Sequence, residues 1–217
     1  MQEYIFMNKI KAVIFDMDGV LIDAKDWHYE ALNDALILFG FEISRKDHLV
    51  NYDGLPTKKK LEMLTRDRGL PRELHDFINE MKQEITLKTA FVKCKPSFNQ
   101  LYALSLLQEN GYRLAACSNS VKKTMEMLFE KSKIKSFFEF YLSNEDVINP
   151  KPHPEMYHKA IDRLKLKPED CLVLEDNENG IKSASDAGAH VMVIEKFNEV
   201  NFQNIMNEIK KIEGKIL

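Results

Sequence analysis

The stretch that decides the fold is AVIFDMDGVL, residues 12–21. Its first four residues are apolar and include β-branched and aromatic side chains, which is typical of a short buried strand. Two carboxylates, Asp16 and Asp18, follow that run at once, and Gly19 suits a turn behind them. The segment therefore predicts a buried strand that ends in a pair of acidic side chains.

Beyond this segment the chain alternates between short apolar runs and helix-like stretches. Four further runs, each followed by a polar residue or a turn, lie at residues 114–117, 140–142, 171–174 and 191–194. The helix-like stretches lie at residues 98–110, 122–131, 154–164 and 179–187. Buried strands that alternate with crossover helices predict an α/β core with a Rossmann-like parallel sheet.

The alternation is interrupted after the first strand, where no further strand of this kind occurs before residue 114. Apolar residues recur there at helical spacing over residues 27–39, 56–68 and 74–87. We therefore predict an α-helical cap domain, residues 24–95, inserted after the first strand. The α/β catalytic core then consists of residues 1–23 and 96–217.

The composition is that of an ordinary globular protein, with 217 residues, 44% of them hydrophobic and 30% charged. The net charge of -3 has the wrong sign for a nucleic-acid surface, and no apolar run is long enough to span a membrane. The three cysteines show no paired spacing, which favours reduced thiols and a cytoplasmic location. We expect no nucleic-acid or membrane partner, and the sequence indicates no obligate protein partner.

Polar side chains follow the other predicted strands as well. Ser118 and Asn119 come after the second strand, and Lys151 lies between two prolines after the third. Glu175 and Asp176 directly follow the fourth strand. Because ligands of open parallel sheets bind outside the carboxyl ends of the strands, these groups should share one rim with the acidic pair of the first strand.

This set of groups suits phosphoryl transfer. Asp16, Asp18 and Asp176 supply the hard oxygen ligands that Mg²⁺ prefers, and a cation would relieve the repulsion between neighbouring carboxylates. Ser118 and Lys151 supply donors for phosphate oxygens. A carboxylate nucleophile would form an aspartyl-phosphate, and a second aspartate would transfer protons.

Simpler explanations of the single motifs stay open at this point. The acidic pair could close a polar turn, or belong to a calcium loop whose other ligands are missing. Ser120 could cap the helix that follows it. A phospho-receiver is disfavoured because Ser143 stands after the third strand, where a receiver carries its aspartate. A nicotinamide enzyme is disfavoured because no GxGxxG motif follows the first strand.

Taken in order, the motifs resemble the four signatures of the haloacid dehalogenase-like hydrolases. They are DMDGVL from Asp16, Ser118 after the second strand, KPHP from Lys151 and EDNENG from Glu175. Each is weak alone, but all four in this order are specific and span most of the chain. The subgroup resembled carries a helical cap after the first motif and includes β-phosphoglucomutases and many sugar-phosphate and nucleotide phosphatases.

The resemblance implies a magnesium-dependent phosphatase of a small phosphorylated metabolite, with a β-phosphoglucomutase-like mutase as the alternative. A true dehalogenase is disfavoured because such enzymes lack the metal. Asp16 matches the nucleophile and Asp18 the general acid/base, both also at the metal, while Lys151 binds phosphate and restrains the nucleophile's charge. Ser118 and Asn119 match the phosphate ligands. Asp176 matches the remaining magnesium ligand, and Glu175 lies beside it in the metal site.

One position matches the mutase pattern and several depart from it. His28 falls at a hinge histidine of the mutases, although a packing histidine explains it equally well. Thr57 and Lys58 lie in the segment that resembles the substrate-specificity loop, with Lys58 where mutases carry a forked arginine. Val121 stands in place of a lysine near the transferring phosphate, and Lys25 replaces an acid at the hinge. These departures favour hydrolysis over mutase activity.

Overall fold

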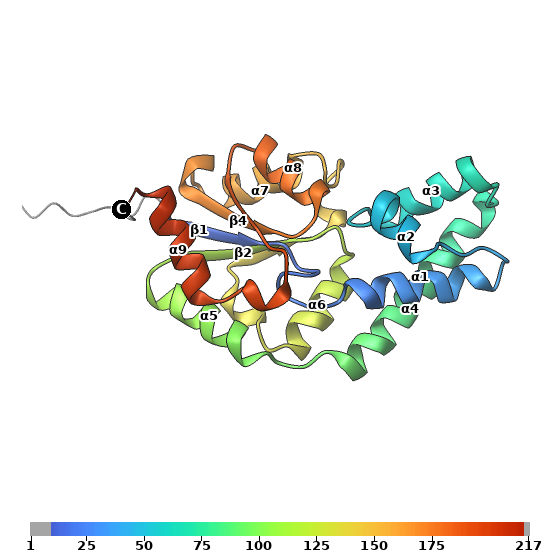
Figure 1. Ribbon diagram of the computed structural model, residues 1–217, viewed down its shortest axis with the longest axis horizontal. Helices are drawn as coiled ribbons and strands as arrows, with labels where there is room; N and C mark the ends of the chain where they lie inside the picture. The colour runs from blue at the N-terminus through green and yellow to red at the C-terminus, as the bar shows by residue number, and fades with distance from the viewer. Residues whose placement is uncertain (1–9, 215–217) are drawn as a thin grey trace, which may run out of the picture.

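A five-stranded parallel sheet forms the centre of the protein in a computed structural model that describes residues 10–214 (Figure 1). The strand order is β3-β2-β1-β4-β5, so the first strand lies in the middle of the sheet. The predicted α/β class with a parallel sheet is confirmed. The strands are β1 (Ala12–Phe15), β2 (Arg113–Cys117), β3 (Phe140–Leu142), β4 (Cys171–Glu175) and β5 (His190–Val193).

Helices cover both faces of the sheet. One face packs against α5 (Phe98–Glu109), α6 (Lys122–Lys131) and α9 (Phe202–Ile212), and the other against α7 (Glu155–Arg163) and α8 (Glu178–Asp186) (Figure 1). Short 3₁₀ turns lie at Arg72–Leu74, Lys135–Phe137, Asn144–Asp146, Pro168–Asp170 and Phe197–Glu199.

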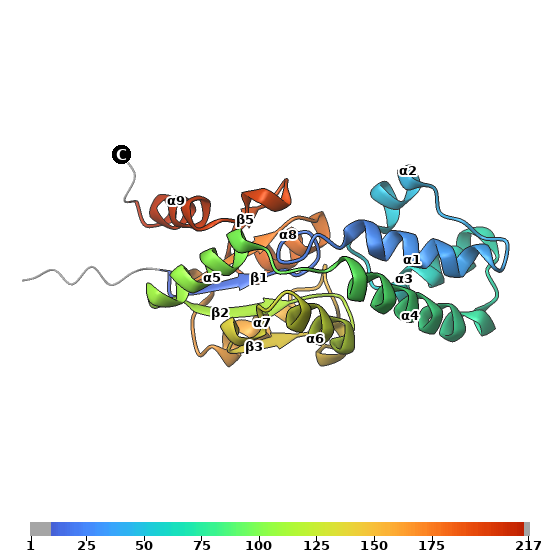
Figure 2. The same ribbon diagram turned by 90° about the horizontal axis from the view of Figure 1, so that it is seen from below.

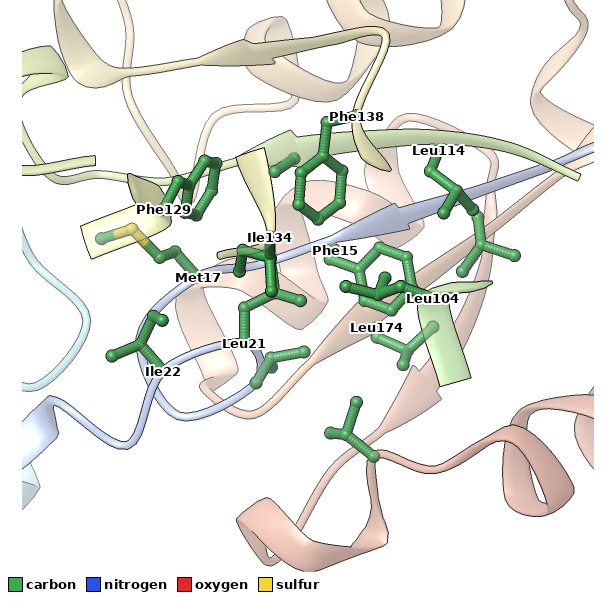
Figure 3. Close-up of a cluster of buried hydrophobic side chains, with 14 of the residues drawn as sticks. Phe15, Met17, Leu21, Ile22, Leu104, Leu114, Phe129, Ile134, Phe138 and Leu174 are labelled. Atoms are coloured by element: carbon green, nitrogen blue, oxygen red, sulfur yellow. The ribbon is translucent and has the colours of Figure 1, made fainter. Parts of the chain in front are cut away.

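The apolar first strand is buried because successive side chains enter opposite layers. Val13 and Phe15 belong to the cluster beneath α5, α6 and α9, while Ala12 and Ile14 belong to the cluster beneath α7 and α8. Figure 3 shows Phe15 among other large apolar side chains of the first cluster, with Phe138 at 6.0 Å between ring centroids. This packing fixes the end of β1, and therefore the start of the acidic loop.

Four helices lie between β1 and α5, at the end of the molecule toward which the strands point (Figure 2). Their own apolar cluster, which includes Leu36, Leu61 and Ile78, is separate from the two clusters of the sheet. We propose on this basis the division into a cap of residues 24–95 and a core of residues 1–23 and 96–217, whose outer ends lie outside the described residues. The helices are α1 (Lys25–Ile37), α2 (Arg45–Asp47) with the π-helical turn His48–Tyr52, α3 (Thr57–Arg68) and α4 (His75–Lys93).

Two features of the chain bear on its surroundings. Within residues 10–214, none of the helices combines the length and apolar character that crossing a membrane requires. Cys94, Cys117 and Cys171 are all buried free thiols.

Candidate active site

Asp16 is the first residue beyond β1, and its side chain is held by a buried lysine. The Asp16 amide donates to the Leu174 carbonyl at 3.0 Å, which prolongs the pairing with β4 and fixes the side chain at the rim. The ammonium of Lys151 donates to Asp16 Oδ1 at 2.7 Å, to Glu175 Oε1 at 2.6 Å and to the Cys117 carbonyl at 2.9 Å. Lys151 thereby joins the ends of three strands through its three protons.

The charges of this group depend on one another. Burial, reinforced by Glu175, raises the pKa of Asp16 well above its usual value, and Lys151 opposes that rise. Burial alone would lower the pKa of Lys151, but Asp16 and Glu175 outweigh it, so the pKa of Lys151 is raised. The lysine is therefore a fixed positive charge beside the candidate nucleophile.

Glu175 is almost completely buried and occupies a closely fitted position. The Tyr157 hydroxyl donates to Glu175 Oε1, the same oxygen that accepts from Lys151. Gly180 of α8 packs directly on this carboxylate, because a Cβ atom there would lie 2.1 Å from Glu175 Oε1. The glycine of the EDNENG motif is thus required by the close approach of α8 to Glu175.

Asp18 points to a different set of partners from Asp16. His28 Nε2 lies 2.9 Å from Asp18 Oδ1, and the Ser120 hydroxyl donates to Oδ2 at 2.9 Å. The Lys82 ammonium lies 3.1 Å from His28 Nδ1. Because an ammonium can only donate, Nδ1 accepts and Nε2 carries the proton that His28 donates to Asp18. His28 of the cap therefore orients the candidate acid/base.

The same contacts set the protonation of Asp18. Burial would raise the pKa of this carboxyl group, but His28, Ser120 and Lys82 together hold the pKa below its usual value. Burial lowers the pKa of His28, which keeps the imidazole neutral. Asp18 is therefore ionised at neutral pH in this arrangement and ready to accept a proton.

Asp176 lies close to Asp16 and pairs with Lys25 of the cap. Lys25 Nζ is 2.6 Å from Asp176 Oδ2, and Gly19 lets the acidic loop approach, since a Cβ atom there would lie 1.7 Å from the same oxygen. Burial and the charge of Glu175 raise the pKa of Asp176 to about 6, against the effect of Lys25. Lys25 stands where the resembled pattern has an acid, and it places a positive charge against these carboxylates.

Three carboxylates at this rim could share a metal ion. Asp16, Glu175 and Asp176 each offer an oxygen atom, and these atoms lie within 4.8 Å of one another. Hard oxygen donors close together, with mutual repulsion that a cation would relieve, fit Mg²⁺. The side chain of Asp18 is outside this group and is engaged by His28 and Ser120.

Hydrogen bonds between loops close the cap over the rim. Asn119 donates from its side-chain amide to the Gly54 carbonyl at 2.9 Å and to the Lys151 carbonyl at 3.1 Å. Asn177 donates to Asp53 Oδ2 at 2.9 Å. Gly54 must be a glycine here, because its φ is +68° and a Cβ atom would lie 2.2 Å from Asn177 Oδ1.

A cavity of about 280 Å³ lies between the rim and the cap. It brings together all the residues that the sequence analysis singled out for the site, although the depth at which they lie differs. Thr57 is half-buried, whereas Lys58 is exposed at the edge. Ser118 is buried and its hydroxyl accepts from the Ser120 amide at 3.0 Å. Val121 also lines the cavity and leaves that part of the wall without charge.

Further side chains of the site were not predicted, among them Ser120, Tyr157, Lys60 and Lys82. From the sequence, Ser120 was considered only as a possible helix cap. Its contact with Asp18 depends on how the end of β2 packs beside the acidic loop that follows β1. Lys60 and Lys82 come from two cap helices whose packing brings them to one wall.

Comparison with known proteins agrees with this geometry. The family model of the haloacid dehalogenase-like hydrolases matches residues 13–194, which include the four motifs and the cap. The chain belongs to this family.

Three similar proteins illustrate the range within it. The chain is 26% identical over 182 residues to a phosphorylated carbohydrates phosphatase of Thermotoga maritima, covering 82% of each chain. It is 26% identical over 195 residues to pyrophosphatase PpaX of Bacillus mycoides, covering 86% of this chain and 84% of the relative. The crystal structure of β-phosphoglucomutase from Clostridium difficile has a TM-score of 0.81 at 21% identity, covering 94% and 99% of the two chains. At 21% identity, the similarity to the Clostridium difficile structure shows a shared fold and no more.

Proposed function

We propose that this protein is a Mg²⁺-dependent phosphatase that hydrolyses a small phosphorylated metabolite, a sugar phosphate or a nucleotide, through an aspartyl-phosphate at Asp16. The observation that carries the proposal is the division of labour between two neighbouring carboxylates. Asp16 lies beside the fixed charge of Lys151, whereas Asp18 lies in a hydrogen-bond network with His28 and Ser120. The names of two relatives, a phosphorylated carbohydrates phosphatase and a pyrophosphatase, support the same class of substrate.

In the proposed first step, Asp16 attacks the phosphorus atom and the bond from phosphorus to the substrate oxygen breaks. Lys151 engages Oδ1, so Oδ2 is the oxygen that we assign to the attack. Asp18, after binding a proton, donates it to the leaving oxygen. Ser118 and Asn119 line the same cavity and can donate to the phosphoryl oxygens.

In the second step, water attacks the phosphorus atom and the bond to Asp16 breaks, which releases inorganic phosphate. The proton of the attacking water goes to Asp18, which is ionised again after its donation in the first step and keeps its contact with His28. Asp16, Glu175 and Asp176 would hold Mg²⁺, with the Asp18 carbonyl as the further ligand that the family resemblance implies. When bound, the ion supplies positive charge that stabilises phosphate oxygens.

A panel of phosphorylated metabolites, assayed for released phosphate with and without Mg²⁺, tests this proposal. Activity should require Mg²⁺, with Ca²⁺ a poor substitute because its ligands bind at longer and looser distances. Asp16→Asn should lower kcat by several orders of magnitude with the fold intact, since an amide is a poor nucleophile. Substantial phosphate release by a folded Asp16→Asn protein would exclude the covalent mechanism.

The alternative is a phosphomutase, in which a sugar hydroxyl rather than water receives the phosphoryl group. Val121 gives the cavity no charge on its side, and Lys58 lies exposed at the edge, so anchors for a second sugar phosphate at these two positions are weak. The two activities separate when β-glucose 1-phosphate is supplied with catalytic glucose 1,6-bisphosphate and followed by phosphorus NMR. A phosphatase gives inorganic phosphate if it accepts the sugar, whereas rapid formation of glucose 6-phosphate without free phosphate identifies a mutase.

A further inference from the structure

The cap wall of the cavity contains a buried lysine, Lys60. Lys60 lies on α3, is 7% exposed and lines the cavity. Among residues 10–214 its ammonium makes no hydrogen bond or ion pair, and the nearest opposite charges act on it only at a distance, from Asp53 and Asp18. Lysine is seldom buried without a partner, so this position calls for an explanation.

Neighbouring cap residues add to the basic character of this wall. Lys82 of α4 lines the same cavity, and the positive charges of Lys60 and Lys82 repel each other. Burial lowers the pKa of both groups to about 8, which leaves them mostly protonated at neutral pH. His48, 3% exposed, also lines the cavity, and its buried Nδ1 atom meets no hydrogen-bond partner in the described part of the chain.

The acidic groups of the cavity do not neutralise this wall. Asp16, Glu175 and Asp176 lie together at the strand rim, where Lys151 and Lys25 already pair with them. Asp53, itself in the cap, is the carboxylate that acts most strongly on Lys60, and it accepts from Asn177 at 2.9 Å and lies 3.5 Å from His48 Nε2. The cavity therefore has an acidic floor and a basic roof.

We propose that Lys60 is a specificity residue that binds a second anionic group of the substrate, remote from the phosphoryl group that is transferred. This inference rests on the proposed function, because it presumes that the phosphoryl group sits at Asp16. It narrows the substrate to doubly anionic organophosphates, either phosphorylated carboxylic acids or bisphosphates. It also places the contact on the buried Lys60 rather than on the exposed Lys58.

Two pairs of phosphate esters test the inference, because the members of each pair differ in a distal anion. They are glycerol 3-phosphate against 3-phosphoglycerate, and fructose 6-phosphate against fructose 1,6-bisphosphate. We expect kcat/KM to favour the doubly anionic member of at least one pair by about tenfold or more, the usual scale for one charge-assisted contact. The first pair reports on a carboxylate and the second on a phosphate.

Variants of three consecutive lysines then locate the contact. Lys60→Met should abolish the preference, mainly by raising KM for the doubly anionic member, and Lys60→Arg should retain it. Lys59→Met is the matched control, since Lys59 is exposed and pairs only loosely with Glu62 at 4.0 Å. The inference is overturned if the preference survives in Lys60→Met, or if Lys58→Met removes it instead.

Binding to the full-length Asp16→Asn protein separates this inference from the proposed function. Calorimetric titration with the same pairs in the presence of Mg²⁺ needs no turnover. Tighter binding of the doubly anionic member, lost when Lys60→Met is added, supports the subsite even if neither pair is hydrolysed. Equal binding of both members in both pairs overturns it even if the protein proves to be an active phosphatase.

Discussion

Replacing Lys151 with methionine should both destabilise the protein and abolish its activity. The change removes the ammonium that contacts Asp16 at 2.7 Å and Glu175 at 2.6 Å, and leaves two buried carboxylates beside an apolar side chain. Methionine fills similar space, so the main effect is the loss of charge rather than a cavity.

The size of the effect follows from these distances. At an effective dielectric constant of about 20, each contact at this distance contributes about 6 kcal/mol of Coulomb attraction. Burying the charges costs several kcal/mol per ion, which offsets much of that attraction. Removal of one partner from a buried pair typically costs about 3–5 kcal/mol, and we expect a loss of that order in the free energy of unfolding.

The loss should depend on pH. Without Lys151 nothing opposes burial and Glu175, so the pKa of Asp16 rises further above its unfolded value. A carboxyl group with a raised pKa in the folded state binds more protons there, and stability is lost as pH rises through the folded pKa. The free energy of unfolding that the variant loses relative to wild type should therefore be larger at about pH 7.5 than at about pH 5.5.

Urea denaturation at both pH values measures this difference. The matched control is Lys182→Met, because Lys182 pairs with Asp186 at the same 2.7 Å but both side chains are exposed. That pair should contribute less than about 1 kcal/mol. A folded Lys151→Met protein as stable as wild type at about pH 7.5 would refute the assigned role of the lysine.

Three further predictions follow from the glycine and lysine contacts. Lys60→Met should stabilise the protein by about 3 kcal/mol at neutral pH, since a pKa displaced to about 8 reflects a penalty for the buried charge. Because that penalty disappears as pH rises from about 8 to about 10.5, the gain in urea denaturation should shrink over the same range, and a constant gain would contradict it. Gly180→Ala should destabilise by about 1–3 kcal/mol, since Glu175 cannot move away from the new methyl group; a rise in Tm would show that it can. Lys25→Met should tighten Mg²⁺ binding several-fold in calorimetry by removing a competing cation, and unchanged or weaker binding would show that Lys25 does not compete.

The core of the fold was predictable because its strands are short and mostly apolar, and the two central strands, β1 and β4, are buried throughout. Residues 12–15 and 140–142 match β1 and β3, and β2 and β4 each extend one residue beyond the apolar run. The extra residues, Arg113 and Glu175, have polar side chains, and it is their backbones that pair with the neighbouring strands. Hydrophobicity does not mark such ends.

Other elements gave weaker signals. The helix predicted at residues 74–87 is α4, which begins at His75 and continues to Lys93 because no helix-breaking residue occurs before Pro96. The C-terminal helix α9 was not predicted, although Ile205 and Ile209 at i, i+4 spacing carry its buried face.

The strand-rim side of the site was predictable, whereas the cap side was predictable only in part. Motifs at the ends of parallel strands must meet at one rim, which places Asp16, Lys151 and Asp176 together without knowledge of the packing. The contacts of the cap depend on the phase of its helices. Lys60 lies four residues before the buried Leu64, so it shares the inner face of α3, and this spacing is the signal that separates it from Lys58.

In the proposed mechanism, Asp16 carries the phosphoryl group during turnover. A decisive experiment quenches the reaction with acid, reduces with borohydride, which converts an acyl phosphate to homoserine, and sequences the peptides by mass spectrometry. We predict homoserine at position 16 only when Mg²⁺ and a substrate from the phosphate-release panel are both present, and at no other aspartate. Steady release of phosphate with unmodified Asp16, or with homoserine at position 18 instead, would exclude a phosphoenzyme at Asp16.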